Sequence, residues 1–284
     1  MERVVDNLPS ETIIRLACFL GVLVLMALAE WCAPRRTTTT DQPARWFNNL
    51  ALVMLNSVVV RIALPMGAVG VALIAEAHGW GVFNMLQLPI WLAALLTVIL
   101  LDFVIYLQHV LFHAVPVLWR LHRVHHADLD FDVTTGLRFH TIEIVISMSI
   151  KIAFVTVLGA PAIGVLIFEV LLNATAMFNH SNVRLPGWLD AVVRLIFVTP
   201  DMHRVHHSAD PRETNSNYGF NLAWWDYLLG TYLAQPALGH DGMTIGLEDF
   251  RDEQQAERIG AMLAMPFLPS ASHGDVGQAP PVRS

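Results

Sequence analysis

Long apolar stretches separated by short polar segments dominate the first two thirds of the chain. These stretches cover residues 13–29, 47–75, 89–112 and 142–178. Because a helix needs about 20 mostly apolar residues to cross a bilayer, each stretch predicts a membrane-spanning segment. The pattern therefore predicts an all-α, polytopic membrane bundle of about four transmembrane helices.

Two of these stretches are interrupted. Arg61 and Pro65 lie within the second stretch, which predicts a tilted or kinked helix. Residues 159–161, Gly-Ala-Pro, divide the last stretch, which forms either a hairpin of two spans or one span with a re-entrant helix. Residues 188–198 are amphipathic with aromatic residues at the edge, and we expect them to lie along the membrane interface.

The positions of the arginines orient the bundle. They follow the first, third and last apolar stretches: Arg35, Arg36, Arg45, Arg120, Arg123, Arg138, Arg184, Arg194, Arg204 and Arg212. Since basic residues are enriched on the cytoplasmic side of membranes, these regions and the C-terminus are predicted to be cytoplasmic. In a bacterium the membrane would be the inner one.

Composition supports this prediction and excludes several classes. Of the 284 residues, 55% are hydrophobic and only 14% are charged, whereas soluble domains carry roughly a quarter charged residues. The formal net charge is −7 with no long basic run, so nucleic acid is not an expected partner. Cys18 and Cys32 are the only cysteines, which excludes zinc ribbons and iron–sulfur clusters held by cysteine.

Histidines carry the candidate chemistry. Three ordered groups have helical ligand spacing: His109 with His113, then His122, His125 and His126, then His203, His206 and His207. In a helix, residues three or four apart lie on one face and can bind one ion together. Two metal ions are the natural stoichiometry, because so many imidazoles exceed what a single ion accepts.

Two further histidines, His140 and His180, stand alone near the ends of the hairpin. A lone histidine is often a hydrogen-bonded core residue, and for these two that alternative is open. Imidazole suits zinc, copper, iron and nickel alike, so the ligand type does not select the metal. Helical zinc hydrolases typically contain H-E-x-x-H, and none of the three histidine groups has that glutamate, which makes peptide hydrolysis unexpected.

The order H-x3-H, H-x2-HH and H-x2-HH resembles the sterol desaturase and fatty acid hydroxylase superfamily of membrane di-iron oxygenases. Three more segments resemble family signatures: "TGLRFHTIE" at Thr135–Glu143, "FNHSNVRLP" at Phe178–Pro186 and "NYGFNLAWWDYLLGTY" at Asn217–Tyr232. Thr141 stands where the family commonly has proline. The resemblance covers roughly Leu95 to Tyr232.

The resemblance implies a cytoplasmic helical cap that carries a non-haem site of two iron ions. With O₂ as co-substrate, the implied enzyme hydroxylates or desaturates an unactivated C–H bond of a lipid. Eight histidines of the three groups match family ligand positions, and His180 matches another. Some members have a further histidine where this chain has Ala176, and His140 is a candidate for that missing ligand. Four carboxylates are candidates for orienting the ligands: Asp102, Glu143, Asp201 and Asp226. Asp201 could equally cap the helix that follows it.

The Arg-Val pair repeated in both H-x2-HH groups places Arg123 and Arg204 opposite the ligand face. There they could pair with acidic groups or dock an electron donor, or remain simple solvated charges. Since no redox module is recognisable in the chain, we expect a separate electron-donor protein. The predicted organisation is an N-terminal transmembrane region over 1–88, a catalytic domain over 89–234, and a polar, partly disordered tail over 235–284.

Two alternatives remain from the sequence. A histidine-rich metal-binding or transport protein would carry ligands along a path near the middle of the membrane. An inactive family member would act as a scaffold. The lipid, whether sterol, fatty acyl or related, is not distinguished by any residue.

Overall fold

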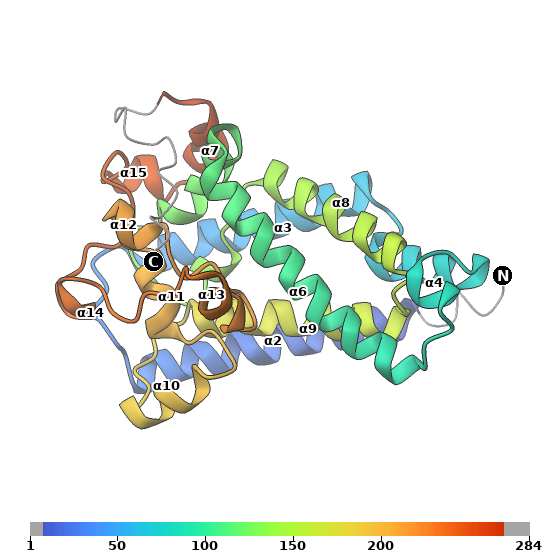
Figure 1. The fold of residues 1–284 in the computed structure, drawn as a ribbon. Helices are drawn as coiled ribbons and strands as arrows, with labels where there is room; N and C mark the ends of the chain where they lie inside the picture. The colour runs from blue at the N-terminus through green and yellow to red at the C-terminus, as the bar shows by residue number, and fades with distance from the viewer. Residues whose placement is uncertain (1–7, 270–284) are drawn as a thin grey trace.

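The computed structural model describes residues 8–269 and is built from helices (Figure 1). The long ones are α2 (Leu8–Cys32), α3 (Gln42–Ala63), α6 (Ile90–Ala114), α8 (Thr141–Leu158) and α9 (Ala162–Asn179). Within the described residues, five helical stretches are long and apolar enough to cross a membrane. Large apolar side chains such as Leu25, Met54 and Val157 point outward from them, as a surface in lipid requires. The predicted helical membrane bundle is confirmed, and the chain is an integral membrane protein.

The apolar stretch after residue 141 forms two helices, which brings the candidate spans to five where about four were expected. Gly159 ends α8 in the left-handed conformation, with φ of 65°, and a Cβ there would lie 2.3 Å from the carbonyl oxygen of Trp80. Glycine alone adopts this backbone conformation without strain and fits this space. Pro161 then caps α9. Of the two forms left open by the sequence, the hairpin is the one observed.

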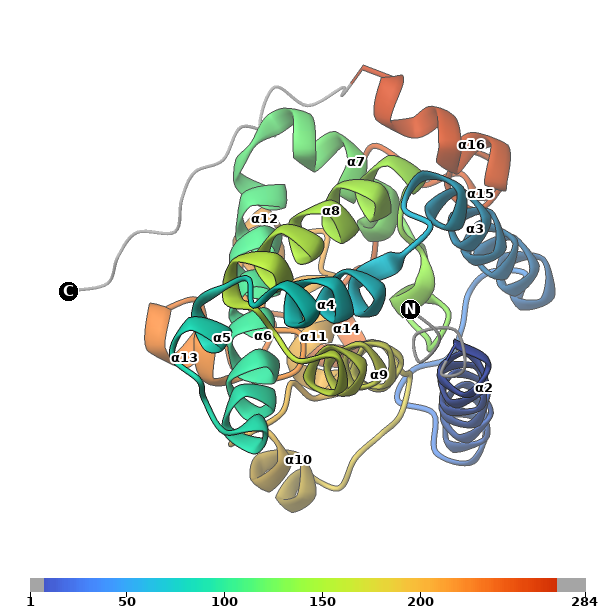
Figure 2. The same cartoon turned by 90° about the vertical axis from the view of Figure 1, so that its right-hand side faces the viewer.

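The second apolar stretch is divided as well, where a single tilted or kinked helix was expected. Helix α3 ends at Ala63, and Pro65 lies in the turn before α4 (Gly67–His78), because proline lacks the N–H that a continuing helix needs. Figure 2 shows α4 between α8 and α9 at the end of the bundle that faces the viewer, and α4 packs against both. The short α5 (Val82–Met85) then leads into α6.

The opposite end of the bundle carries a cap of short helices (Figure 1). The cap contains α7 (Pro116–His126), η1 (Thr135–Leu137), α10 (Gly187–Val193), α11 (Pro200–His206), α12 (Pro211–Thr214), α13 (Trp224–Leu229), α14 (Gly239–Gly242), α15 (Glu253–Ala256), α16 (Ile259–Ala264) and η2 (Met265–Phe267). Trp188 of α10 is 71% exposed and Leu228 of α13 is 73% exposed. Helix α10 lies in the segment predicted to follow the membrane interface, and that position stays a prediction.

Buried ion pairs fix the cap to the bundle. Arg45 of α3 is buried and donates to both carboxylate oxygens of Asp128, at 2.5 and 2.8 Å, and to Asp132. Arg138 is also buried and donates to the Val124 carbonyl at 2.8 Å and to Glu257. A buried charge left without its partner is costly, so these pairs hold the segment between α7 and α8 in one arrangement.

The segment after residue 234, predicted as a polar tail, is folded over much of its described length. Met262 and Met265 are fully buried and pack with Leu52 of α3 and Val124 of α7. The apolar residues of α16 and η2 provide this packing, although the residues before them in the tail are polar. The disorder expected for part of this tail falls mainly outside the described residues.

The ion pair between Arg138 and Glu257 predicts a measurable loss of stability. Glu257→Gln removes the negative charge but keeps the shape of the side chain, and we expect it to lower the free energy of unfolding by about 3 kcal/mol. Glu253→Gln is the matched control, because Glu253, the first residue of α15, is exposed, and it should change stability by less than about 0.5 kcal/mol. Thermal unfolding of both purified variants measures the difference, and equal midpoints would contradict it.

Candidate metal centre

Two prolines start the helices that carry most of the histidines. Helix α6 ends in His109 and His113, Val115 is extended, and Pro116 opens α7 with its three histidines. Pro200 similarly opens α11, where the Thr199 hydroxyl caps the Met202 N–H at 3.3 Å. Proline is favoured at the first helical position because that N–H needs no partner within the helix. The two prolines therefore determine where the histidine-bearing helices α7 and α11 begin.

The structure brings nine of the thirteen histidines together in two adjacent groups. The first group contains His109, His113, His122, His126 and His206, and the second contains His125, His180, His203 and His207. Within each group the candidate ligand nitrogens lie within 4.8 Å of one another. The rings of His126 and His207, one from each group, are stacked with centroids 4.6 Å apart. All nine side chains are buried.

The hydrogen bonds of the first group determine which nitrogen of each ring carries the proton. The Nδ1 of His109 lies 2.8 Å from the Tyr218 carbonyl, and the Nδ1 of His206 lies 2.6 Å from the Ser216 carbonyl. A carbonyl only accepts, so both Nδ1 atoms carry hydrogen and both neutral rings present a bare Nε2. These two Nε2 atoms are 3.0 Å apart. Two lone pairs at this distance repel unless a cation binds them.

The second group repeats this arrangement. The Nδ1 of His180 lies 2.7 Å from the Ala176 carbonyl, and that of His125 lies 3.2 Å from the Arg138 carbonyl. Their Nε2 atoms face each other at 3.1 Å, and His203 Nε2 is equally close to that of His180. The donor set therefore fits metal ions in both groups.

Burial keeps these imidazoles neutral. It lowers the pKa of His122 to about 3 and that of His180 to about 3, and it holds the pKa of His126, His203 and His207 well below the usual value. A neutral imidazole is the form that binds a metal ion. At neutral pH the ligand nitrogens are thus available without loss of a proton.

One predicted carboxylate contacts a ligand ring and two act through a loop. Glu143 accepts a hydrogen bond from His122 Nδ1 at 2.6 Å. Asp226 accepts from the backbone N–H groups of Tyr218 and Gly219, each at 2.8 Å, and so positions the Tyr218 carbonyl that holds His109. Asp102 of α6 accepts a hydrogen bond from the Nε1 of Trp225 at 2.8 Å, and Trp225 is the neighbour of Asp226 in the chain. Outer contacts of this kind orient metal ligands.

Asp201 does neither of the things expected of it. It pairs with Arg204 and, at 3.4 Å, with Arg35, while Thr199 caps the helix. The expectation that Arg123 and Arg204 could dock an electron donor is also wrong, because both side chains are buried. Arg204 pairs with an acidic group, Asp201, which was one of the expected alternatives. Arg123 donates to the Leu268 carbonyl at 2.7 Å.

His140 lies outside both histidine groups. Its Nδ1 accepts from the Ile142 N–H at 3.2 Å and caps α8, and its Nε2 lies 3.3 Å from the Leu263 carbonyl. Both ring nitrogens are therefore engaged by the backbone. The structure does not support the expectation that His140 replaces the ligand missing at Ala176.

A cavity of about 320 Å³ leads from the first histidine group into the bundle. His109, His122 and Glu143 line it beside the candidate metal centre, and residues of α2, α3, α6, α8 and α9 form most of its remaining walls. Phe112, Phe139 and Phe220 line the part close to the imidazoles. An apolar molecule in this cavity would lie beside the buried candidate ligands His109 and His122.

The chain is similar to known proteins along most of its length. Residues 94–231 match the fatty acid hydroxylase family. Ornithine lipid hydroxylase OlsE of Rhizobium tropici is 30% identical over 272 residues, which cover 92% of this chain and 78% of that protein. The chain belongs to the fatty acid hydroxylase family.

More distant relatives agree with this membership. Alkylglycerol monooxygenase of Xenopus tropicalis is 26% identical over 88% of this chain, which spans 54% of that protein. The human alkylglycerol monooxygenase is 27% identical over 60% of the chain, which covers 38% of its length. No solved structure matches the chain with significance. The resemblance identified from the histidine spacing is thereby confirmed.

Three charged residues inside the cavity were not predicted as site residues. Lys151 of α8, Glu169 of α9 and Arg15 of α2 all line it. A charged residue within an apolar span is itself a signal of function, because charge is costly in the membrane. That signal was present at each of these positions.

The bond between Glu143 and His122 predicts an effect on metal affinity. Glu143→Gln keeps an acceptor oxygen but removes the charge that favours the ring orientation, so metal affinity should fall roughly 10- to 100-fold. Competition with a chelator measures the affinity of purified protein. Glu248→Gln, at an exposed glutamate, is the control and should match the wild type.

Gly136 provides a test of the packing around His180. A Cβ at residue 136 would lie 2.4 Å from the Ala176 carbonyl oxygen and 3.0 Å from His180 Nδ1. These two atoms form the hydrogen bond that orients the His180 ring. Gly136→Ala should therefore lower stability by about 1–3 kcal/mol and reduce the bound metal. Gly187→Ala is the matched control, because a Cβ there meets nothing within 4 Å. Similar metal content in the two variants would show that the contact does not position His180.

Proposed function

We propose that this chain is a membrane-bound non-haem di-iron oxygenase that hydroxylates or desaturates an unactivated C–H bond of a lipid. The observation that carries the proposal is the set of facing, neutral imidazole nitrogens that opens onto a cavity among membrane-spanning helices. Relatives named as lipid hydroxylases and monooxygenases support oxidation as the reaction and a lipid as the substrate.

In this proposal the first histidine group holds one iron ion and the second group holds the other. Imidazole also binds zinc and copper, but hydroxylase and monooxygenase relatives favour iron. The two ions, when bound, would supply the activation of O₂ that breaking such a C–H bond requires. Electrons come from a separate donor protein.

Side chains and carbonyls around the site orient the ligand rings, position the lipid and keep water away from the reaction. Glu143 and the carbonyls of Tyr218, Ser216 and Ala176 hold the ligand rings in one tautomer and orientation. Phenylalanines at the inner end of the cavity exclude water and place the lipid chain beside His109 and His122.

The alternatives drawn from the sequence fit less well. A transport protein needs ligands along a path through the membrane. Most of these imidazoles instead come from the end of α6, from α7 and from α11, at the capped end of the bundle (Figure 1). An inactive scaffold has no need of nine buried ligands in the protonation state that binds metal. Both observations favour the enzyme.

Metal analysis of histidine variants tests this proposal. Wild-type protein purified without chelator should contain two iron ions per chain. His125→Ala and His206→Ala, one in each group, should each lose metal and abolish lipid oxidation while the protein still inserts into membranes. Lipid extraction with mass spectrometry measures the product. Less than one metal ion per chain in the wild type would contradict the proposal.

His140→Ala is the matched control. It removes a helix cap worth about 1 kcal/mol but no proposed ligand, so its metal content should equal that of the wild type. Loss of metal in His140→Ala, with normal metal content in Glu248→Gln and Gly187→Ala, would show that His140 is a metal ligand.

A further inference from the structure

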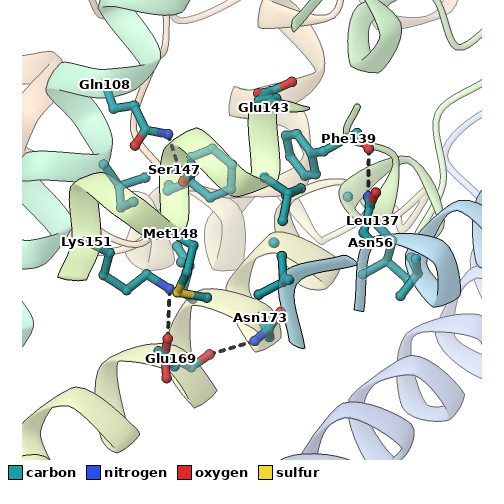
Figure 3. A pocket seen from close by; sticks show the side chains of 18 of the residues that line it. Asn56, Gln108, Leu137, Phe139, Glu143, Ser147, Met148, Lys151, Glu169 and Asn173 are labelled. Carbon is teal, nitrogen blue, oxygen red and sulfur yellow. Dashed lines mark hydrogen bonds and ion pairs between the residues drawn. The ribbon is translucent and has the colours of Figure 1, made fainter. Parts of the chain in front are cut away.

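The far end of the cavity holds a cluster of charged side chains from three different spans. Lys151 of α8 donates to Glu169 Oε1 of α9 at 2.9 Å, and Arg15 of α2 donates to the other oxygen of the same carboxylate. Figure 3 shows Lys151 and Glu169 at one side of the cavity, away from Glu143, with Met148 beside them. The side chains of Lys151 and Glu169 are only 8% and 6% exposed.

This cluster offers donors rather than acceptors. Both oxygens of Glu169 are already engaged by the two cations. Lys151 and Arg15 together carry more N–H groups than Glu169 and Glu11 accept. Asn173 and Ser147 add further polar groups to the wall. With Glu169 and Glu11 the cluster carries no net charge, but its surplus N–H groups belong to cations. A ligand group that fits here must therefore bring acceptor oxygens, and N–H groups of a cation bind an oxyanion more strongly than a neutral oxygen.

The cavity between the cluster and the metal centre is suited to a hydrocarbon chain. Its lining includes the apolar side chains of Ile144, Met148 and Leu172. Glu143, which contacts His122, and Lys151 are eight residues apart on α8, which corresponds to about 12 Å along the helix. The side chain of Arg15 is 30% exposed, so the charged end is also the more accessible one. A polar end, an apolar middle and an inner metal centre match the shape of an amphiphile.

We propose that the cavity binds its lipid with an oxyanion, a carboxylate or a phosphate, against Lys151 and Arg15 and with the chain directed to the metal centre. The lipid's role as a substrate rests on the proposed function, but its binding does not. Lys151 thereby determines specificity: it selects acidic amphiphiles and sets which carbon reaches His109 and His122.

Binding of three ligands with one chain length tests the proposal. Hexadecanoate, hexadecyl phosphate and hexadecanol differ only in the polar group, and each is titrated into the purified full-length protein in a maltoside detergent. At least one anion should bind tenfold or more tightly than the alcohol. Whichever anion binds more tightly identifies the source of the oxyanion. Equal affinity for all three ligands would overturn the proposal.

Variants of Lys151 locate the binding site. Lys151→Met should weaken binding of the preferred anion about tenfold and leave hexadecanol within about twofold, while Lys151→Arg keeps the preference. An equal loss for all three ligands in Lys151→Met would overturn the assignment. If Lys151→Met does not fold because Glu169 loses its partner, Lys151→Met with Glu169→Gln removes both charges and is judged by the same criterion.

The position of oxidation provides an independent readout. With tetradecanoate, hexadecanoate and octadecanoate, an anchored carboxylate predicts oxidation at one position counted from the carboxylate. A position constant from the methyl end would overturn the proposal. Anion-selective binding without any oxidation or iron in the wild type would instead contradict the proposed function and leave the oxyanion site supported.

Discussion

The candidate site depends on one constraint: each ligand ring must present a bare nitrogen toward its neighbours. Backbone carbonyls and Glu143 achieve this by accepting the Nδ1 hydrogens of His109, His125, His180, His206 and His122. The Nε2 atoms then converge at about 3 Å with lone pairs facing each other. Such a cluster is unfavourable by itself and favourable around cations, so the surrounding protein must be rigid enough to hold it.

That rigidity comes from buried polar contacts rather than from the apolar core alone. Asp226 fixes the Tyr218 segment, and Arg138 presents its carbonyl to His125 while its side chain pairs with Glu257. These contacts connect the imidazoles to segments more than a hundred residues away in the chain. Within a low-dielectric interior each such pair is costly to break, which restricts the cap to one arrangement.

The same physics gives the cavity its two ends. Near the imidazoles its wall is aromatic and apolar, and at Lys151 and Glu169 it is charged. In this membrane protein, α8 and α9 leave their common turn at Gly159 and enclose the cavity with α2, α3 and α6. The hairpin that supplies two candidate spans therefore also supplies opposite charges to one binding surface.

The sequence by itself determined the helical membrane bundle, the family and eight of the nine imidazoles of the two groups by helical spacing, because apolar runs and i, i+4 positions are local properties. His180 was matched only through the family resemblance. Tertiary structure alone decided that His140 caps a helix, that Arg123 and Arg204 are buried, and that Lys151 meets Glu169. Hydrogen-bond partners of this kind come from distant segments, and local periodicity carries no information about which segments meet.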